Sequence, residues 1–257
     1  MAGRIIAIAN QKGGVGKTTT VINLAASLAA EKRSILVIDL DPQGNLTSGL
    51  GLKGRTTDAG TVYAALTAAD APPVSDFVLS TVVEGLSLIP ADRNLTGAEV
   101  ELIGLPNREE RLRQFLAPVR DLFDYVFVDS PPSLGLLTLN ALVAADTVLI
   151  PLHCEYFALE GLADLISTLR RVRSALNPDL GIEGVVLTMY DERTNLGRQV
   201  EHDVREFFKQ KVFQTVIPRN IRLGEAPSHG LPALLYAARS KGAEAYVALA
   251  KELESRG

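Results

Sequence analysis

Residues 4–20 read RIIAIANQKGGVGKTTT and contain three kinds of sequence in succession. The short isoleucine-rich run is typical of a buried strand, the glycine-rich stretch favours a turn, and the Ala/Leu-rich segment up to Ala30 predicts a helix. Glycines let backbone N–H groups turn inward around an anion, and a helix N-terminus adds a favourable dipole for negative charge. The stretch therefore predicts a phosphate-binding loop between a strand and a helix.

Lysine and threonine side chains give this loop its chemistry. Lys17 is placed to neutralise the β and γ phosphates of a nucleotide, and the Thr18 hydroxyl is placed to ligate Mg²⁺. The usual phosphate-loop pattern has a glycine five positions before Gly16, where this chain has Gln11 followed by Lys12. We expect the loop to aim Lys12 away from its own nucleotide and toward that of a neighbouring chain.

Two further predicted strands end in carboxylates. The run Ser34–Asp39 is followed by LDPQGN, and the run Tyr125–Asp129 is followed by SPP. In open α/β sheets, ligands bind in the crevice at the carboxyl ends of parallel strands. Alternation places Asp39 and Asp41 on one side, suited to holding hydrated Mg²⁺ and orienting a water, although Asp and Pro-Gln-Gly also favour an ordinary turn. Asp129 has the position of the second metal carboxylate of phosphate-loop NTPases.

The rest of the chain alternates between β-branched runs and helical patterns. The apolar pattern from Leu162 to Leu176 predicts a helix that ends at Asn177-Pro178, and Leu50–Asp76 is expected to be a loop or short helices at the sheet edge. Such alternation predicts one α/β domain over residues 1–257, with a mostly parallel twisted sheet and helices on both faces. The expected strands are Arg4–Ala9, Ser34–Asp39, Leu86–Pro90, Tyr125–Asp129, Thr147–Pro151, Glu183–Thr188 and Val212–Ile217.

Composition excludes several classes of protein. A chain of 257 residues, 47% of them hydrophobic, can bury a sizeable hydrophobic core without disulfide bonds or structural metals. A lone cysteine, Cys154, excludes an internal disulfide and a cysteine-rich metal site. The sequence shows no signal-peptide pattern and no apolar stretch long enough for a membrane span, which predicts a soluble, cytoplasmic protein. The net charge of −4 argues against constitutive, charge-driven binding to nucleic acid.

The three motifs together resemble those of the deviant Walker A ATPases and, within them, the ParA/Soj partition proteins. These motifs are KGGVGKT at 12–18, DLDPQGN at 39–45 and DSPP at 129–132. Further segments agree with the same family, namely EYFALEG at 155–161, MYDERTN at 189–195, IPRN at 217–220 and EAPSHG at 225–230. The short, chromosome-type members fit best, because a first strand at Arg4 leaves no room for the N-terminal helix-turn-helix domain of longer plasmid relatives.

The resemblance implies a P-loop ATPase that uses ATP and Mg²⁺. Nucleotide contacts would come from the loop residues Lys12, Gly13, Gly14, Val15, Gly16, Lys17, Thr18 and Thr19, and from Met189, Pro218, Arg219 and Asn220. Of the second group, Pro218 and Asn220 would lie near the adenine. Metal contacts would come from Thr18, Asp39 and Asp129. Lys12, Lys17 and Asp41 would be the catalytic residues, with Asp41 positioning the hydrolytic water.

The same resemblance implies a switch in chromosome or plasmid segregation. ATP would close a sandwich homodimer in which Lys12 contacts the partner's ATP, and this dimer would bind double-stranded DNA without sequence preference. Arg193 and Arg222 are the best candidates for contacts with DNA phosphates, and dimerisation would double their number. A ParB-type centromere-binding protein would stimulate slow ATP hydrolysis and release, so the protein would be associated with the nucleoid.

The nearest alternative is a MinD-like membrane-cycling ATPase in division-site placement, which shares all three motifs. Such a protein needs a C-terminal amphipathic helix rich in Lys or Arg. The last predicted helix here has an apolar side formed by Ala243, Tyr246, Val247, Ala250 and Leu253. Its charged residues include Glu244, Glu252 and Glu254 against Lys251 and Arg256. This pattern favours a helix packed on the core. A metabolic ligase or kinase of the same fold is a further alternative, which would show turnover dependent on a small acceptor.

Overall fold

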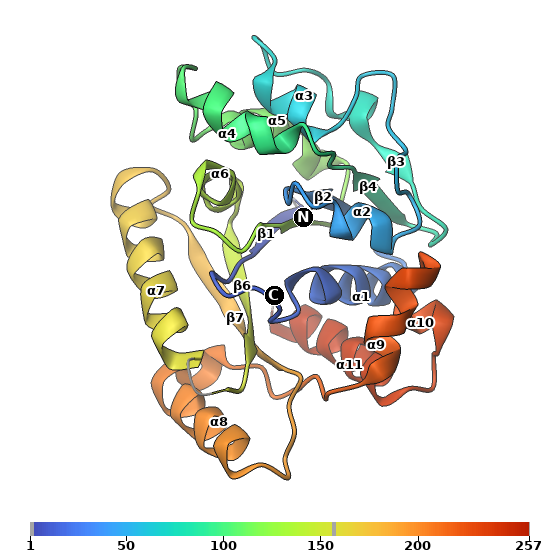
Figure 1. The fold of residues 1–257 in the computed structure, drawn as a ribbon, viewed down its shortest axis with the longest axis vertical. Helices are drawn as coiled ribbons and strands as arrows, with labels where there is room; N and C mark the ends of the chain where they lie inside the picture. Colours follow the sequence, from blue (N-terminus) through green and yellow to red (C-terminus); the bar gives the residue numbers. More distant parts are fainter. Residues whose placement is uncertain (1–2, 156–157, 257) are drawn as a thin grey trace.

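The computed structural model describes residues 3–155 and 158–256. Within these ranges the strands form one seven-stranded sheet in the order β3-β4-β2-β5-β1-β6-β7 (Figure 1). Its neighbouring strands are parallel, except that β3 runs antiparallel to β4. The strands are β1 (Arg4–Ile8), β2 (Ile35–Asp39), β3 (Leu79–Ser80), β4 (Leu86–Ile89), β5 (Tyr125–Asp129), β6 (Thr147–His153) and β7 (Gly181–Thr188).

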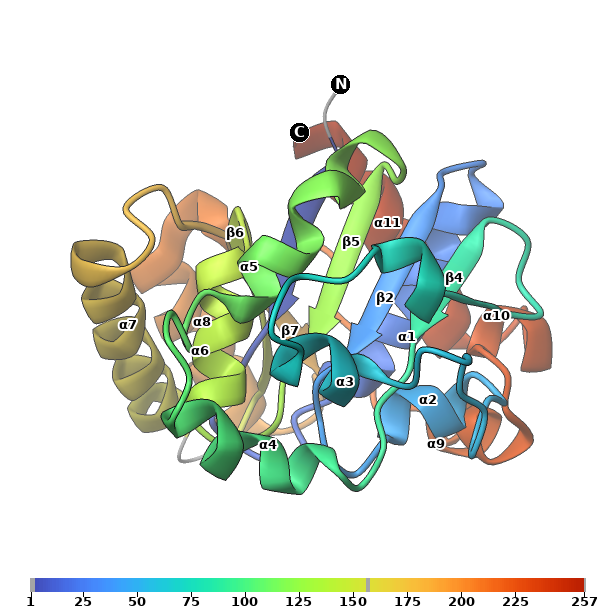
Figure 2. The same ribbon diagram turned by 90° about the horizontal axis from the view of Figure 1, so that it is seen from above.

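Helices cover both faces of this sheet, as Figures 1 and 2 show. On one face, a single apolar cluster joins the strands to α1 (Lys17–Ala30), α2 (Asn45–Gly49), α9 (Ile221–Glu225), α10 (Ala233–Tyr236) and α11 (Lys241–Arg256). A second cluster joins the other face to α3 (Val62–Thr67), α4 (Leu95–Ile103), α5 (Arg111–Leu116), α6 (Leu136–Ala144), α7 (Ala158–Ala175) and α8 (Asn195–Phe208). The predicted α/β architecture is therefore confirmed.

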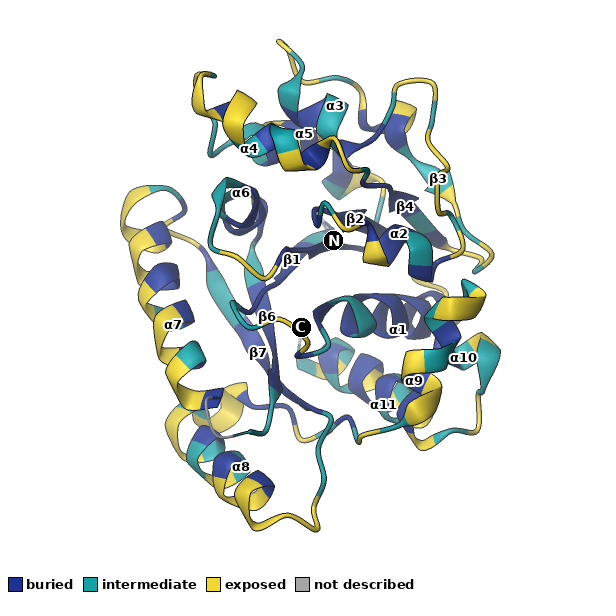
Figure 3. Ribbon diagram, in the orientation of Figure 1, coloured by how far each residue is buried: buried dark blue, intermediate teal, exposed yellow. Residues whose placement is uncertain are grey.

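The central strands are buried on both sides, as their dark blue colour in Figure 3 shows. Every residue of β2 and of β5 is buried, because helices cover both sets of alternating side chains. This burial extends to the last residue of each strand. Asp39 and Asp129 each have an exposed fraction of 0%, so two carboxyl groups lie in surroundings that disfavour charge.

The prediction of a strand over Val212–Ile217 is wrong. This segment touches β7 only at separate points, such as the single bridge between Val185 and Val212. The amides of Gln214 and Thr215 donate instead to the Glu252 carboxylate of α11, at 2.7 and 2.8 Å. Because these amides are already hydrogen-bonded to Glu252, the segment cannot form a continuous ladder of backbone hydrogen bonds with β7. The two-residue strand β3 was not among the expected strands, and its pairing with β4 covers only two positions.

The other local predictions hold. Leu50–Asp76 contains only the short helix α3 and the start of a 3₁₀ turn, and α7 ends just before Asn177. The predicted apolar side of α11 packs on the core, with Tyr246 and Leu253 almost fully buried. No helix in the described part of the chain is long and apolar enough to cross a membrane. Two residues of the family-like segment 155–161, at 156 and 157, lie outside the described residues.

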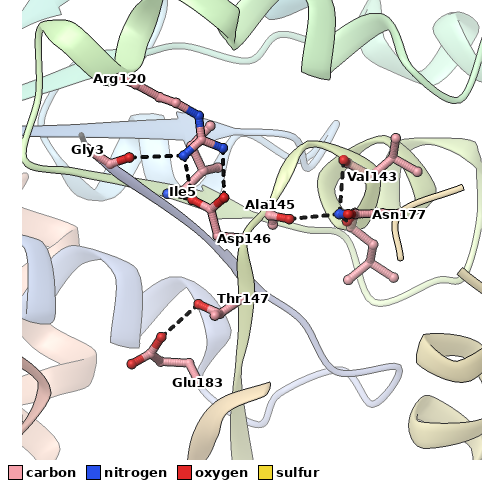
Figure 4. Close-up of polar contacts among 10 residues, drawn as sticks. Gly3, Ile5, Arg120, Val143, Ala145, Asp146, Thr147, Asn177 and Glu183 are labelled. Carbon is pink, nitrogen blue, oxygen red and sulfur yellow. Dashed lines mark hydrogen bonds and ion pairs between the residues drawn. The ribbon is translucent and has the colours of Figure 1, made fainter. Parts of the chain in front are cut away.

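Polar contacts hold the amino-terminal edge of the sheet together (Figure 4). The Asp146 carboxylate accepts hydrogen bonds from both terminal nitrogens of Arg120, at 2.8 and 2.7 Å, and from the Ile5 amide at 2.8 Å. Asn177 Nδ2 donates to the carbonyls of Val143 and Ala145, which closes the end of α6. These contacts stabilise the edge opposite the carboxyl ends of the strands.

Candidate functional site

A cavity of about 1020 Å³ lies at the carboxyl ends of the central strands, a volume that suits a nucleotide. It brings together many of the predicted site residues, namely Gly13, Gly14, Gly16, Lys17, Thr18, Thr19, Asp41, Met189, Pro218, Arg219 and Asn220. The remaining predicted residues are not part of its lining, namely Lys12, Val15, Asp39, Asp129, Arg193 and Arg222. The cavity therefore collects the loop, the segment after β2 and two segments from the second half of the chain.

The phosphate loop has a fixed backbone. Gly16, with φ 86°, is the N-terminal cap of α1 in the left-handed region, which glycine adopts without strain. The first amides of α1 have no intrahelical acceptor, so they can donate to an anion. From β7, the Thr188 hydroxyl donates to the carbonyl of the buried Val15 at 2.8 Å. The Asn10 side chain accepts from the Lys12 amide at 3.0 Å, which fixes the other end of the loop.

The Lys17 ammonium lies inside the loop. Its Nζ donates to the carbonyls of Asn10 and Lys12, at 3.0 and 3.1 Å. Burial lowers the pKa of Lys17, and the nearby Asp129 and Asp41 carboxylates oppose that shift. The loop thus holds a buried ammonium whose present partners are backbone carbonyls of the same loop, which a phosphate group can replace.

Thr18 and Asp129 form a polar pair at the start of α1. The Thr18 hydroxyl donates to Asp129 Oδ2 at 2.7 Å, while Asp129 Oδ1 is buried without a hydrogen-bond partner among the described residues. Burial first, and then the charge of Asp39, raise the pKa of Asp129 well above its usual range. A nearby cation would relieve this cost, and hydroxyl and carboxylate oxygens are the ligands that Mg²⁺ accepts. The residues therefore fit a magnesium ion at this point.

Asp39 and Asp41 have different surroundings, although both belong to the same motif. The Asp39 carboxylate accepts from the Asp41 amide at 3.2 Å and from the amide and hydroxyl of Thr47 at 2.8 and 2.7 Å. Burial raises the pKa of Asp39 to about 6, against the effect of these hydrogen bonds. Asp41 lines the cavity, and its Oδ1 accepts from the Gln43 amide at 3.0 Å. Only the second carboxylate therefore faces the cavity.

Two distant segments form one wall of the cavity. The Tyr190 amide donates to the Ile217 carbonyl at 3.0 Å, and the Arg219 amide donates to the Tyr190 carbonyl at 3.2 Å. This pairing places Tyr190 opposite Pro218, and Met189 and Pro218 both line the cavity. Met189 has φ 48°, a left-handed conformation that is costly for a residue with a side chain. Strain of this kind is concentrated at functional sites.

Lys12 is separated from the cavity that its loop helps to form. Its ammonium pairs with the carboxylate of Glu155, which follows β6, and His153 Nδ1 lies 3.6 Å from the same carboxylate. The ion pair with Lys12 lowers the pKa of Glu155. This placement is the one expected of a lysine that serves a second chain, and that role stays a prediction.

The two arginines predicted to contact DNA lie near the ends of the paired segments. Arg193 donates twice to the Asp191 carboxylate, at 2.8 and 2.7 Å, and Arg222 donates to Glu225 at 2.6 Å. The side chains of Arg193 and Arg222 are 84% and 51% exposed. Exposed ion pairs are weak and are screened by salt, so phosphates can compete with these carboxylates. Their contact with DNA stays a prediction.

Sequence reasoning assigned no site role to several polar residues at or near the cavity, among them Asn10, Thr47, Ser48 and Thr188. Asn10 and Thr188 lie at the carboxyl ends of β1 and β7, where the rule applied to the acidic motifs would also have found them. Ser48 lines the cavity and, with Thr47, follows the DPQGN motif directly. No local pattern shows that Thr47 binds a carboxylate eight residues earlier.

Comparisons with known proteins agree with this site. The model of the AAA domain family matches residues 3–182. The chromosome partitioning protein ParA of Myxococcus xanthus (strain DK1622) is 55% identical over 254 residues, which cover 99% of this chain and 89% of that protein. This chain belongs to the ParA/Soj family. The sporulation initiation inhibitor protein Soj of Bacillus subtilis (strain 168) is also 55% identical, over 255 residues that cover 99% of this chain and all of that protein.

A solved structure supports the same assignment of the fold. Cobyrinic acid a,c-diamide synthase from Mycobacterium smegmatis, with a bound ATP analogue and magnesium, matches with a TM-score of 0.81 at 39% identity. The match covers 97% of this chain and 93% of that one. The predicted P-loop fold of the ParA/Soj family is thereby confirmed. That neighbour has the name of a biosynthetic enzyme, whereas the more similar ParA and Soj relatives do not, and the higher identity decides the family.

Proposed function

We propose that this ParA/Soj-family chain is an ATP-driven switch in the segregation of chromosome or plasmid DNA. The observation that carries the proposal is the meeting of Lys17, Thr18 and Asp129 at the start of α1. There, first-turn amides, a buried ammonium and an unsatisfied carboxylate oxygen combine the features needed for a nucleotide with its Mg²⁺. The M. xanthus relative is named a chromosome partitioning protein, which supports DNA as the molecule that is segregated.

Binding of the nucleotide would use groups that the loop already holds in place. Lys17 would exchange the carbonyls of Asn10 and Lys12 for the β and γ phosphates. Thr18 and Asp129 would hold the metal, and the wall formed by Met189 and Pro218 to Asn220 would contact the base. Bound MgATP supplies the phosphoanhydride bond that is hydrolysed and a cation that offsets its charge.

Hydrolysis would depend on Asp41, the acidic residue that lines the cavity. The Gln43 amide holds one of its carboxylate oxygens, which fixes the orientation of the group. A carboxylate fixed in this way can accept a hydrogen bond from a water and orient it for attack. Phosphate-loop NTPases without a well-placed positive finger turn over at about 10⁻⁴ to 10⁻³ per second, so a slow switch is expected.

The ATP-bound state would be a homodimer that binds double-stranded DNA without sequence preference. Lys12, which lies outside its own cavity, would reach the partner's nucleotide across the interface. Arg193 and Arg222 would contact DNA phosphates from both chains. A ParB-type centromere-binding protein would stimulate hydrolysis and so release the DNA. We expect the protein to be cytoplasmic and associated with the nucleoid.

The experiment that tests this function is DNA retention by the ATP-bound dimer on two unrelated duplexes across a salt series. With two phosphate contacts from each chain, the log–log salt slope should be about −3.6. Arg222→Glu removes two attractions and adds two repulsions, so retention should fall about equally on both duplexes. Arg173→Glu is the matched control, because Arg173 is exposed on α7, far from α9 (Figure 1).

Two results would contradict the proposal. Undiminished retention by Arg222→Glu would remove Arg222 from the DNA interface. A strong preference of the wild type for one duplex would contradict binding through the phosphate backbone alone.

A further inference from the structure

The Asp39 carboxylate joins two parts of the segment that carries Asp41. Its Oδ1 accepts from the Asp41 amide at 3.2 Å, and its Oδ2 accepts from both the amide and the hydroxyl of Thr47. Asp41 therefore lies in a short stretch of chain whose two ends are both bound to Asp39. All three hydrogen bonds are inside the protein, where they are stronger than in water.

This contact also begins α2. Gly44, the N-terminal cap of α2, has no side chain with which to bind the first amides of the helix. Thr47 is the third residue of α2, so its amide has no acceptor within the helix. Asp39, at the end of β2, supplies that acceptor from eight residues earlier, and the Thr47 hydroxyl in turn accepts from the Ala91 amide at 3.1 Å. The start of α2 is thus fixed to the ends of two strands.

Asp39 differs from Asp129 in what remains available to a metal. A carboxylate has about four acceptor positions, and Asp39 uses three of them for protein donors. Asp129 accepts one hydrogen bond from Thr18, and its Oδ1 has no partner in the described ranges 3–155 and 158–256. Of the two, Asp129 is the carboxylate with an oxygen to spare.

We propose that Asp39 is a positioning residue, which fixes the Asp41 carboxylate at the cavity by binding the backbone of Asp41 itself and the Thr47 end of the segment that follows it. This role replaces the sequence-based expectation that Asp39 ligates the metal, and it rests on the proposed ATPase function. Without these hydrogen bonds, the segment 41–47, which contains a glycine, could adopt many turn conformations. A displacement of about 1 Å in a group that orients a reacting water can cost about 100-fold in rate.

The test uses Thr47, which does not line the cavity and therefore separates positioning from metal binding. Thr47→Val removes the hydroxyl but keeps the amide and the shape of the side chain. We expect the rate of hydrolysis of bound ATP to fall by about 10-fold or more, while the ATP affinity and the Mg²⁺ concentration for half-maximal activity stay unchanged. Thr47→Ser, which restores the hydroxyl, should recover the wild-type rate.

A second measurement needs no nucleotide. Hydrogen–deuterium exchange of the peptide covering residues 41–47 should be faster in Thr47→Val than in the wild type, and normal in Thr47→Ser. Asp39→Asn should show the same faster exchange and the same reduced rate, because an amide offers one acceptor oxygen in place of two.

Two results would overturn the proposal. One is a Thr47→Val variant with wild-type exchange and a wild-type rate. The other is an Asp39→Asn variant whose main defect is a many-fold higher Mg²⁺ requirement, as expected for a metal ligand. Asp41→Ala separates this failure from failure of the proposed function. If neither the wild type nor any variant hydrolyses ATP, the proposed function is wrong; if Asp41→Ala hydrolyses ATP like the wild type, the catalytic role of Asp41 is wrong; and if Asp41→Ala is defective while Thr47→Val and Asp39→Asn are normal, the positioning role is wrong.

Discussion

The Thr18 hydroxyl donates a hydrogen bond of 2.7 Å to the Asp129 carboxylate across 111 positions of sequence. This contact joins the first turn of α1 to the end of β5. It arises because β1 pairs in parallel with β5, with Ile8 opposite Asp129, so the loop after β1 starts beside the end of β5. Two motifs that are separate in the sequence thereby become one site.

Lys17→Ala should abolish ATP binding, because it removes the buried ammonium that the loop holds for the phosphates. Isothermal titration with ATP and Mg²⁺ measures this loss directly. Lys12→Ala is the matched control, because Lys12 belongs to the same loop but does not line the cavity. This variant should still bind ATP as a monomer. Equal ATP affinity of Lys17→Ala and the wild type would contradict the phosphate-loop assignment.

Gly13→Val should leave ATP binding intact and prevent dimerisation. A Cβ atom at Gly13 would have Pro132 Cβ at 3.9 Å as its nearest neighbour, an ordinary contact, so the folded monomer accommodates a side chain there. The expected obstruction is between two loops across the sandwich. Sizing by gel filtration with MgATP tests it, and a variant that dimerises like the wild type would place the interface elsewhere.

Asp129→Asn should stabilise the nucleotide-free protein at pH 7 while destroying Mg²⁺-dependent hydrolysis. Asp129 is fully buried next to Asp39, and an amide removes the cost of a second buried charge. The gain in the free energy of unfolding should be about 1–3 kcal/mol. Urea unfolding of the two proteins measures it. A clear loss of stability would show that the charged form of Asp129 is favoured by its surroundings.

The same carboxylates set the pH dependence of stability. Because the pKa of Asp39 is raised to about 6 in the folded state, from about 4 in the unfolded chain, the folded protein binds this proton more tightly. The stabilisation is fully present below about pH 4 and is lost as the pH rises through about 6. Asp129 extends the loss to higher pH. Urea unfolding from pH 4 to 8 should show two losses of stability in the wild type, one linked to Asp39 and one to Asp129. In Asp129→Asn only the loss linked to Asp39 should remain.

The sequence predicted those parts of the fold and site whose causes are local. The apolar runs correctly predicted six of the seven strands of the sheet, and the rule on carboxyl strand ends predicted that Asp41 lies at the nucleotide cavity. The segment after β7 was assigned to the same cavity only through the resemblance to the ParA/Soj family. The errors have distant causes. Val212–Ile217 has the residues of a strand, but Glu252 of α11 takes its amides. The surroundings of Asp39 depend on Thr47, and no periodicity in the sequence reports that contact.

The central claim, a switch closed by ATP, is tested most directly by the mass of Asp41→Ala in solution. This variant should bind MgATP but not hydrolyse it, so its closed state should accumulate. Light scattering should give twice the 27.6 kDa of the chain with MgATP and a single chain with MgADP, and Asp41→Ala combined with Gly13→Val should be a single chain with both nucleotides. A mass of one chain for Asp41→Ala with saturating MgATP would contradict the account.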